Sequence, residues 1–144
     1  MEKLYVEFLL WASGIGTNEG YEALLNELFM QEPNNSLLLE LEQISSSVLE
    51  TRARFFRYFN HEHALDTAFF GKNLFSALER IYRLELLPIA DFAVKCSPLS
   101  HYLPQELYFV DPFYILSYVD DPLGWNDEKQ VRELFEKAFG FYKQ

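Results

Sequence analysis

Apolar side chains recur at spacings of three and four residues along most of this 144-residue chain, and this periodicity limits the fold more than any other feature. The clearest stretch can be capped by Asn126 or Asp127, and it places Val131, Leu134, Phe135, Ala138, Phe139 and Tyr142 on one face of a helix. The pattern predicts a mostly α fold, a compact helical bundle of about six helices.

Glycine, proline and capping residues divide the N-terminal half. An apolar face (Leu4, Tyr5, Phe8, Leu9, Ala12) stops at residues 13–16, and Thr17 or Asn18 can cap a second helix that ends before Pro33. A long seam over residues 37–59 follows, in which Ser47 and Glu50 form a capping-box sequence that allows a break. A polar interval is predicted over residues 60–73, and then another helical face from Leu74 to Tyr82; Pro88 opens a further short helix.

Residues 97–125 are the least helical part of the sequence, an irregular segment rich in proline and aromatic residues. Each Asp-Pro pair within it is read as a helix N-cap followed by proline at the first helical position, or else residues 113–119 form a β-strand bounded by turns. A short helix is favoured, and a short β-hairpin is the alternative. We take residues 1–144 as a single helical domain, because the length is typical of one domain.

Composition points to a soluble intracellular protein. The only cysteine is Cys96, so an intrachain disulfide of the secreted kind is excluded. No segment approaches the length of apolar sequence that spans a bilayer, and Glu2 and Glu7 interrupt any resemblance to a signal peptide. We therefore predict a cytoplasmic protein without a membrane partner. Aromatic residues make up 17% of the chain, enough to build a core from large rings.

The formal net charge is −10. Such a field repels nucleic acid and attracts cationic proteins, so we predict no nucleic-acid partner. The basic and aromatic run with Arg52, Arg54 and Arg57 is interpreted as pairing internally with glutamates such as Glu40, Glu42 or Glu50, although a ligand-binding role stays open.

Few residues carry a pattern typical of catalysis. His61, His63 and Asp66 have metal-ligand side chains, but their spacing is poor for a site on one helix, and we predict no metal and no cofactor. Cys96 lies at apolar spacing from Phe92 and is read as a buried structural thiol, not as the partner of His101. The glycines at 14 and 16 are read as a helix terminator.

The acidic residues of the proline-rich segment are interpreted first as caps and second as partner-binding groups. The whole chain, small, acidic, aromatic and without a catalytic motif, resembles in character the bacterial immunity proteins, which bind and neutralise a toxin, often a basic nuclease. The resemblance implies a non-enzymatic inhibitor that occludes a cationic toxin. For the interface we choose the acidic rim and aromatic anchor formed by Asp111, Asp120, Asp121, Trp125 and Asp127.

Three alternatives remain open. In the first, Trp125 packs under the last helix instead of meeting a partner. In the second, the chain is a homodimer or holds a small ligand between helices, for which a pocket is the discriminating observation. In the third, the chain is a metal-dependent hydrolase in which His61 and His63 converge with a distant carboxylate.

Overall fold

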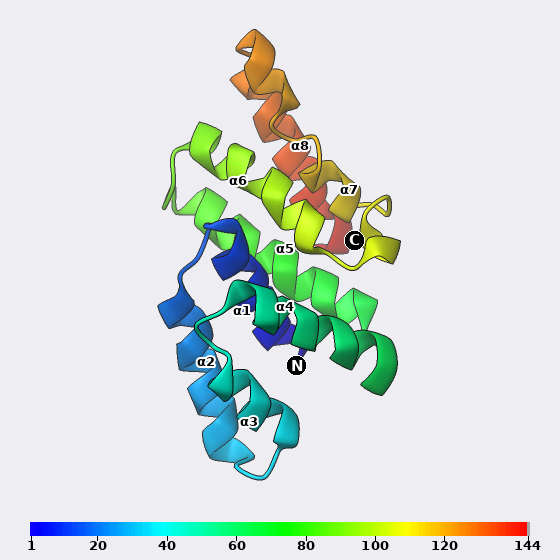
Figure 1. The fold of residues 1–144 in the computed structure, drawn as a ribbon. Coiled ribbons are helices and arrows are strands. Elements are labelled where there is room, and N and C mark those ends of the chain that lie inside the picture. Colours follow the sequence, from blue (N-terminus) through cyan, green and yellow to red (C-terminus); the bar gives the residue numbers. More distant parts are fainter. Residues whose placement is uncertain (144) are drawn as a thin grey trace. The chain divides into compact units, whose positions relative to one another are not determined.

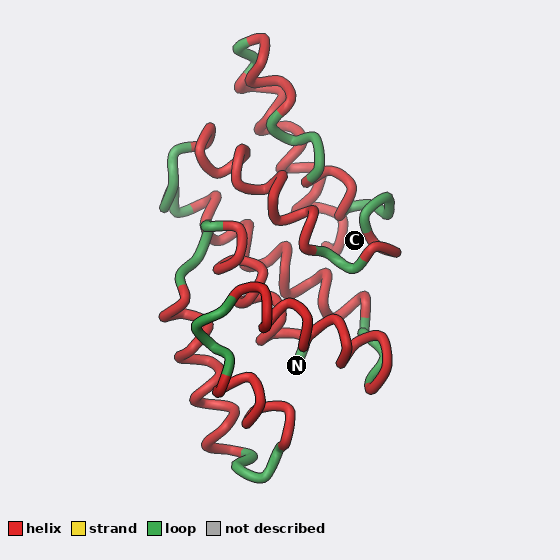
Figure 2. Tube along the Cα trace, in the orientation of Figure 1, coloured by secondary structure: helices red, strands yellow, loops and turns green. Residues whose placement is uncertain are grey.

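The computed structural model describes residues 1–143, and helices are the only regular structure in that part of the chain (Figures 1 and 2). It contains eight α-helices and several short 3₁₀ or π turns. The mostly α prediction is confirmed. The chain forms two compact units, Met1–Asp66 and Thr67–Gln144. The prediction of a single domain over residues 1–144 stays a prediction.

The first unit contains α1 (Glu2–Ser13), α2 (Asn18–Gln31), α3 (Ser36–Gln43), α4 (Val48–Arg57) and the π turn η1 (Tyr58–Glu62). Gly14 ends α1 with a φ of 81°, a left-handed conformation that glycine adopts without steric cost. The Gly20 N–H donates to Thr17 Oγ1 at 3.1 Å, and the Glu50 N–H donates to Ser47 Oγ at 3.2 Å. Both caps were predicted, and the second divides the long seam into α3 and α4.

The core of this unit is made of stacked and tilted rings. Phe55 of α4 is fully buried, and its ring centre lies 5.2 Å from that of Tyr5 and 5.5 Å from that of Phe8. Tyr21 of α2 contacts Phe8 and Phe55 edge to face. The predicted aromatic core is therefore present, and Phe55 lies at its centre.

The second unit contains α5 (Thr67–Arg83), α6 (Ile89–Tyr102), η2 (Gln105–Leu107), α7 (Phe113–Leu116), η3 (Asp121–Trp125), α8 (Glu128–Gly140) and η4 (Phe141–Lys143). Its core is also aromatic. Phe70 stacks on Phe113 with ring centres 5.8 Å apart, and Phe92 contacts Phe135 at 4.9 Å. The predicted apolar face of α8 is buried at Val131, Phe135, Ala138 and Phe139.

Several boundary predictions were wrong. The polar interval ends at residue 66 and not at 73, because Phe70 is fully buried and α5 already begins at Thr67. The helix after Pro88 is 14 residues long and continues through Pro98, since Cys96, Leu99 and Ser100 are buried along it. There are eight α-helices and not six, and residues 113–116 form a helix, so the hairpin alternative fails over the described residues.

Among residues 1–143, no helix combines the length and the apolar character needed to cross a bilayer.

Gly71 of α5 lies against the Tyr142 side chain, so whether alanine at position 71 stabilises or destabilises the protein depends on Tyr142. A Cβ there would lie 2.0 Å from the phenol oxygen of Tyr142, whose ring contacts Phe75. We expect Gly71→Ala to destabilise the protein because the Tyr142 ring must leave its position. In a Tyr142→Ala background the same change should stabilise by up to about 1 kcal/mol, the helix-propensity gain. Urea unfolding of the four proteins measures the coupling, and additive effects would contradict the packing described.

Candidate functional site

One stretch of the second unit contains no lysine or arginine. Between Lys95 and Lys129 the chain carries six acidic residues: Glu106, Asp111, Asp120, Asp121, Asp127 and Glu128. This acidic segment, residues 96–128, covers the second half of α6, the turns η2 and η3, α7 and the start of α8. Its electrostatic field attracts positively charged groups.

A connected set of rings lies on this acidic segment, partly open to solvent. It consists of His101, Tyr108, Phe109, Tyr114 and Tyr118, which we call the aromatic surface. Successive ring centres are 6.0 Å apart for His101 and Tyr108, 4.8 Å for Tyr108 and Phe109, and 5.6 Å for Phe109 and Tyr114. Tyr114 and Tyr118 are 5.1 Å apart. Phe109 is 76% exposed and Tyr114 38%.

Local packing explains why these rings point outward. In α7, Phe113, Ile115 and Leu116 are buried, so the remaining residue of the turn, Tyr114, is left on the outside. Before α7, Leu107 is buried, and the Val110 N–H donates to the Leu107 carbonyl oxygen at 3.0 Å. The Val110 carbonyl oxygen in turn accepts from the Tyr114 N–H at 3.0 Å. Phe109 is therefore presented on a turn that is fixed at both ends.

The predicted partner-binding residues belong to the same acidic segment as this surface. Asp111 is exposed, and its charge acts on Tyr118; burial raises the pKa of the Tyr118 phenol, and Asp111 raises it further. Asp121 and Trp125 are exposed within η3, which follows Tyr118 closely, and Asp120 is half-buried at its start. Asp127 begins α8, where its Oδ1 accepts from the Gln130 N–H at 3.0 Å.

The alternative position for Trp125 is wrong. Its side chain is 60% exposed and does not pack under the last helix. In η3 the buried residue is Pro122, which leaves Trp125 at the open end of the turn. The ring is therefore open to solvent, and its role as an aromatic anchor stays a prediction.

Three of the predicted caps are absent. Pro112, and not Asp111, occupies the N-cap position of α7, which begins one residue later than the Asp-Pro pattern indicates. Asp120 precedes η3 but makes no capping hydrogen bond through its side chain, and Asp121 lies inside that turn. Of these four aspartates, only Asp127 caps a helix through its side chain. The other three carboxylates therefore have no capping role that explains their presence.

The ionised carboxylate of Asp120 lowers the stability of the folded protein. Burial raises the pKa of its carboxyl group above the ordinary value, and the charge of Asp121 adds to the shift. A raised carboxyl pKa means that ionisation opposes folding, so this destabilising effect is present at pH 7 and disappears as the pH falls below the unfolded pKa of about 3.9.

We therefore expect Asp120→Asn to raise the thermal unfolding midpoint at pH 7 and to leave it unchanged near pH 3, because Asp120 is then protonated in both states. Thermal unfolding followed by circular dichroism at the two pH values measures this. Asp111→Asn, at an exposed carboxylate, is the matched control and should have a smaller effect at pH 7. An Asp120→Asn variant that is less stable at pH 7 would contradict the assignment.

The other candidates do not assemble into a chemical site. Cys96 is fully buried, and burial raises the pKa of its thiol, which confirms the structural interpretation. Arg54, 7% exposed, donates from Nε to Glu40 at 2.5 Å and from Nη1 to Glu62 at 2.6 Å. Internal pairing of the arginines is thus confirmed for Arg54, with Glu62 as a partner that was not predicted.

Arg54 engages the carboxylate that lies between His61 and His63, which leaves that pair without Glu62 as an available third ligand. Over residues 1–143, no three His, Cys, Asp or Glu side chains are grouped to hold a metal ion. The hydrolase alternative therefore receives no support from the arrangement of these residues.

Comparison of the chain with protein-family models, curated proteins and solved structures gives no match. Sequence reasoning missed Phe109 and Tyr114, the two most exposed tyrosine and phenylalanine rings of the surface. The lack of lysine and arginine over residues 96–128 and the apolar run at 108–110, between turn residues, are the signals that would have indicated them.

Proposed function

We propose that this chain is a non-enzymatic inhibitor of the immunity type, which binds a basic toxin protein and occludes its cationic cleft. The proposal rests mainly on one observation: an exposed cluster of rings lies on a segment of 33 residues that has six carboxylates and no lysine or arginine. Interfaces of this kind combine central aromatic anchors with a charged rim. A basic nuclease, whose cleft must attract nucleic acid, is the class of toxin that fits best.

In this proposal the two parts of the site act differently. Phe109 and Trp125 fill pockets on the partner and supply most of the affinity, since each exposes a large ring to water in the unbound chain. Asp111, Asp120 and Asp121 steer a cationic partner and set the rate of association. The chain then blocks the toxin by covering its cleft, a mechanism that needs no catalytic residue and no cofactor. The cytoplasm is the compartment that fits the single buried thiol.

A homodimer through the same surface is less favourable. A symmetric dimer would bring like patches together, and the acidic segment of one copy would face the acidic segment of the other. Opposed like charges lower affinity, whereas a basic partner is attracted. The charge of the segment thus favours a heterologous partner over a second copy.

The proposal is tested by purifying the tagged chain from its native cells at low and at high salt, and by identifying the retained proteins with mass spectrometry. A stoichiometric basic protein that is retained at low salt and released at high salt supports the proposal. A Phe109→Ser chain, run in parallel, should retain much less of it. Recovery of the chain alone, or of a partner retained equally by both chains, would contradict the assigned surface.

A further inference from the structure

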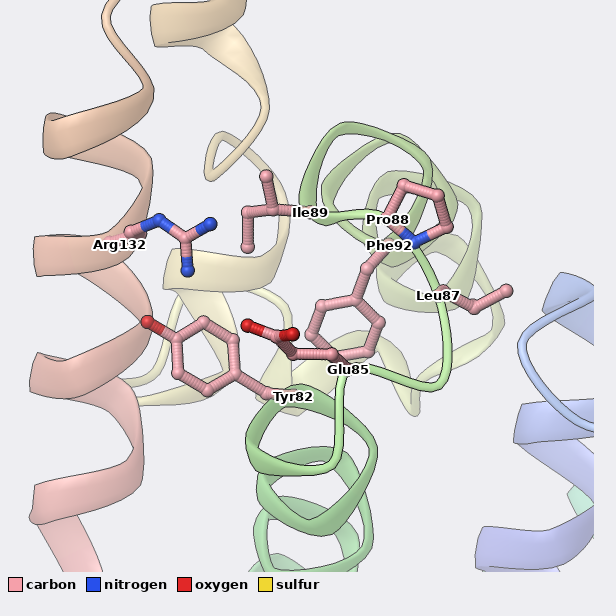
Figure 3. Close-up of a pocket in the computed structure, with 7 residues that line it drawn as sticks. All are labelled: Tyr82, Glu85, Leu87, Pro88, Ile89, Phe92 and Arg132. Carbon is pink, nitrogen blue, oxygen red and sulfur yellow. The ribbon is translucent and has the colours of Figure 1, made fainter.

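A small pocket in the second unit has oppositely charged groups on an otherwise largely apolar lining. It lies where α5 ends, α6 begins and α8 passes by, and its volume is about 320 Å³. Leu87, Ile89 and Phe92 supply apolar side chains, and Tyr82, Glu85 and Arg132 supply polar ones. Figure 3 shows the Arg132 guanidinium and the Glu85 carboxylate directed toward one another across the pocket, with the Phe92 ring beside Glu85.

The cation is fixed in place. Arg132 donates to Glu128 Oε1 from Nε at 3.1 Å and from Nη2 at 2.8 Å. Hydrogen bonds with Glu128 and with the Tyr82 side chain raise the pKa of the guanidinium. These hydrogen bonds orient the guanidinium, whose planar group of donors matches the geometry of a carboxylate.

The backbone of Glu85, the anionic residue of the pocket, is held in an unfavourable conformation. Glu85 has a φ of 51°, a left-handed backbone that favours glycine. Its N–H donates to the Tyr82 carbonyl oxygen at 3.2 Å, and the Leu86 N–H donates to the Ile81 carbonyl oxygen at 3.2 Å. This is the Schellman ending of a helix, in which the position of Glu85 is usually glycine. Over residues 1–143, the Glu85 carboxylate pairs with no basic side chain.

We propose that this pocket binds a free α-amino acid with an apolar side chain. The ligand carboxylate binds Arg132, the ammonium group binds Glu85, and the side chain packs on Ile89 and Phe92. A volume of about 320 Å³ is at the lower end for ligand pockets, which suits one amino acid and not a peptide. A zwitterion can contact Arg132 and Glu85 at once, whereas a simple anion or cation can contact only one of them. The inference is independent of the toxin-binding surface.

The binding test uses the full chain and free leucine, with amide chemical shifts as the readout. We expect saturable shifts at residues 82–87, 89–92 and 132. Leucinamide lacks the carboxylate and N-acetylleucine lacks the ammonium group, so each should bind at least about tenfold more weakly than leucine, as loss of one charge-assisted hydrogen bond implies. Equal binding of the three compounds, or no shifts up to about 10 mM leucine, which corresponds to negligible affinity, would overturn the proposal.

Two variants locate the site. Glu85→Gly should fold at least as well as the native chain, because glycine suits the left-handed position, yet bind leucine at least about tenfold more weakly. Arg132→Gln should show a similar loss of binding. Lys129→Gln removes an exposed cation from the same helix and should leave binding unchanged. Leucine binding that survives both substitutions would refute the site, as would an equal loss in the Lys129 variant.

Discussion

The Phe109→Ser variant is expected to bind the basic partner about thirtyfold more weakly than the native chain. This factor corresponds to about 2 kcal/mol, the lower limit for an aromatic anchor at the centre of an interface. Its free energy of unfolding should change by no more than about 0.5 kcal/mol, because the ring is 76% exposed in the unbound chain. Titration of the captured partner by calorimetry and urea unfolding of both proteins measure the two effects.

Leu49→Ser is the matched control for this prediction. Leu49 belongs to the first unit and is 77% exposed, so the substitution removes an equally open apolar side chain outside the aromatic surface. It should leave partner binding unchanged. Trp125→Ser tests the second anchor separately, and its effect tells whether η3 belongs to the same interface. If Phe109→Ser and Leu49→Ser bind the partner equally well, the aromatic surface is not the interface.

The Phe55→Ala variant should lose about 3–5 kcal/mol of folding free energy, the usual cost of removing a buried phenylalanine ring. Phe55 is fully buried and contacts Tyr5, Phe8, Tyr21 and Phe59, so the cavity cannot be filled by one neighbour moving. Such a loss is a large share of the 5–15 kcal/mol typical of a small protein. Urea unfolding followed by circular dichroism measures it.

Phe56 gives the internal comparison, because it follows Phe55 in the same helix and is 61% exposed. Phe56→Ala should change the unfolding free energy by about 0.5 kcal/mol or less, as is usual at the surface. Equal losses for the two variants would mean that α4 does not bury the face described here.

Helix ends that depend on local chemistry could be predicted from the sequence. Gly14, Thr17, Ser47 and Asp127 act through their own backbone conformation or through a hydrogen bond to an N–H two or three residues away, and all four were among the predicted boundary residues. The apolar face of α8 was predicted for the same reason, because its period is visible without knowledge of its neighbours.

Features that depend on tertiary packing could not be predicted. Residues 97–125 were predicted to be the least helical part, but burial of Cys96 and Leu99 extends α6 through Pro98 to Tyr102. Asp111 was expected to cap a helix, but the buried ring of Phe113, stacked on Phe70, fixes where α7 begins. In both cases contacts with residues distant in sequence outweighed the local preference.

The charges of the candidate site and one of its anchors, Trp125, were chosen from the sequence, but the other anchor, Phe109, was not. The carboxylates were chosen because they lie in the proline-rich segment that is least helical in sequence, and Trp125 was chosen with them. The exposure of Phe109 depends on Leu107 and Phe113 being buried on either side of it, which composition does not reveal. The pocket was also beyond prediction, because Glu85 and Arg132 are far apart in sequence and meet only through the packing of α5, α6 and α8.

The most direct test of the central claim is protection of growing cells. The basic protein that copurifies with the chain is expressed from an inducible promoter, alone and together with the native chain or the Phe109→Ser, Trp125→Ser double variant. We predict that the partner stops growth, that the native chain restores it, and that the double variant does not. Growth that the native chain fails to restore, although the complex forms, would contradict an inhibitor role.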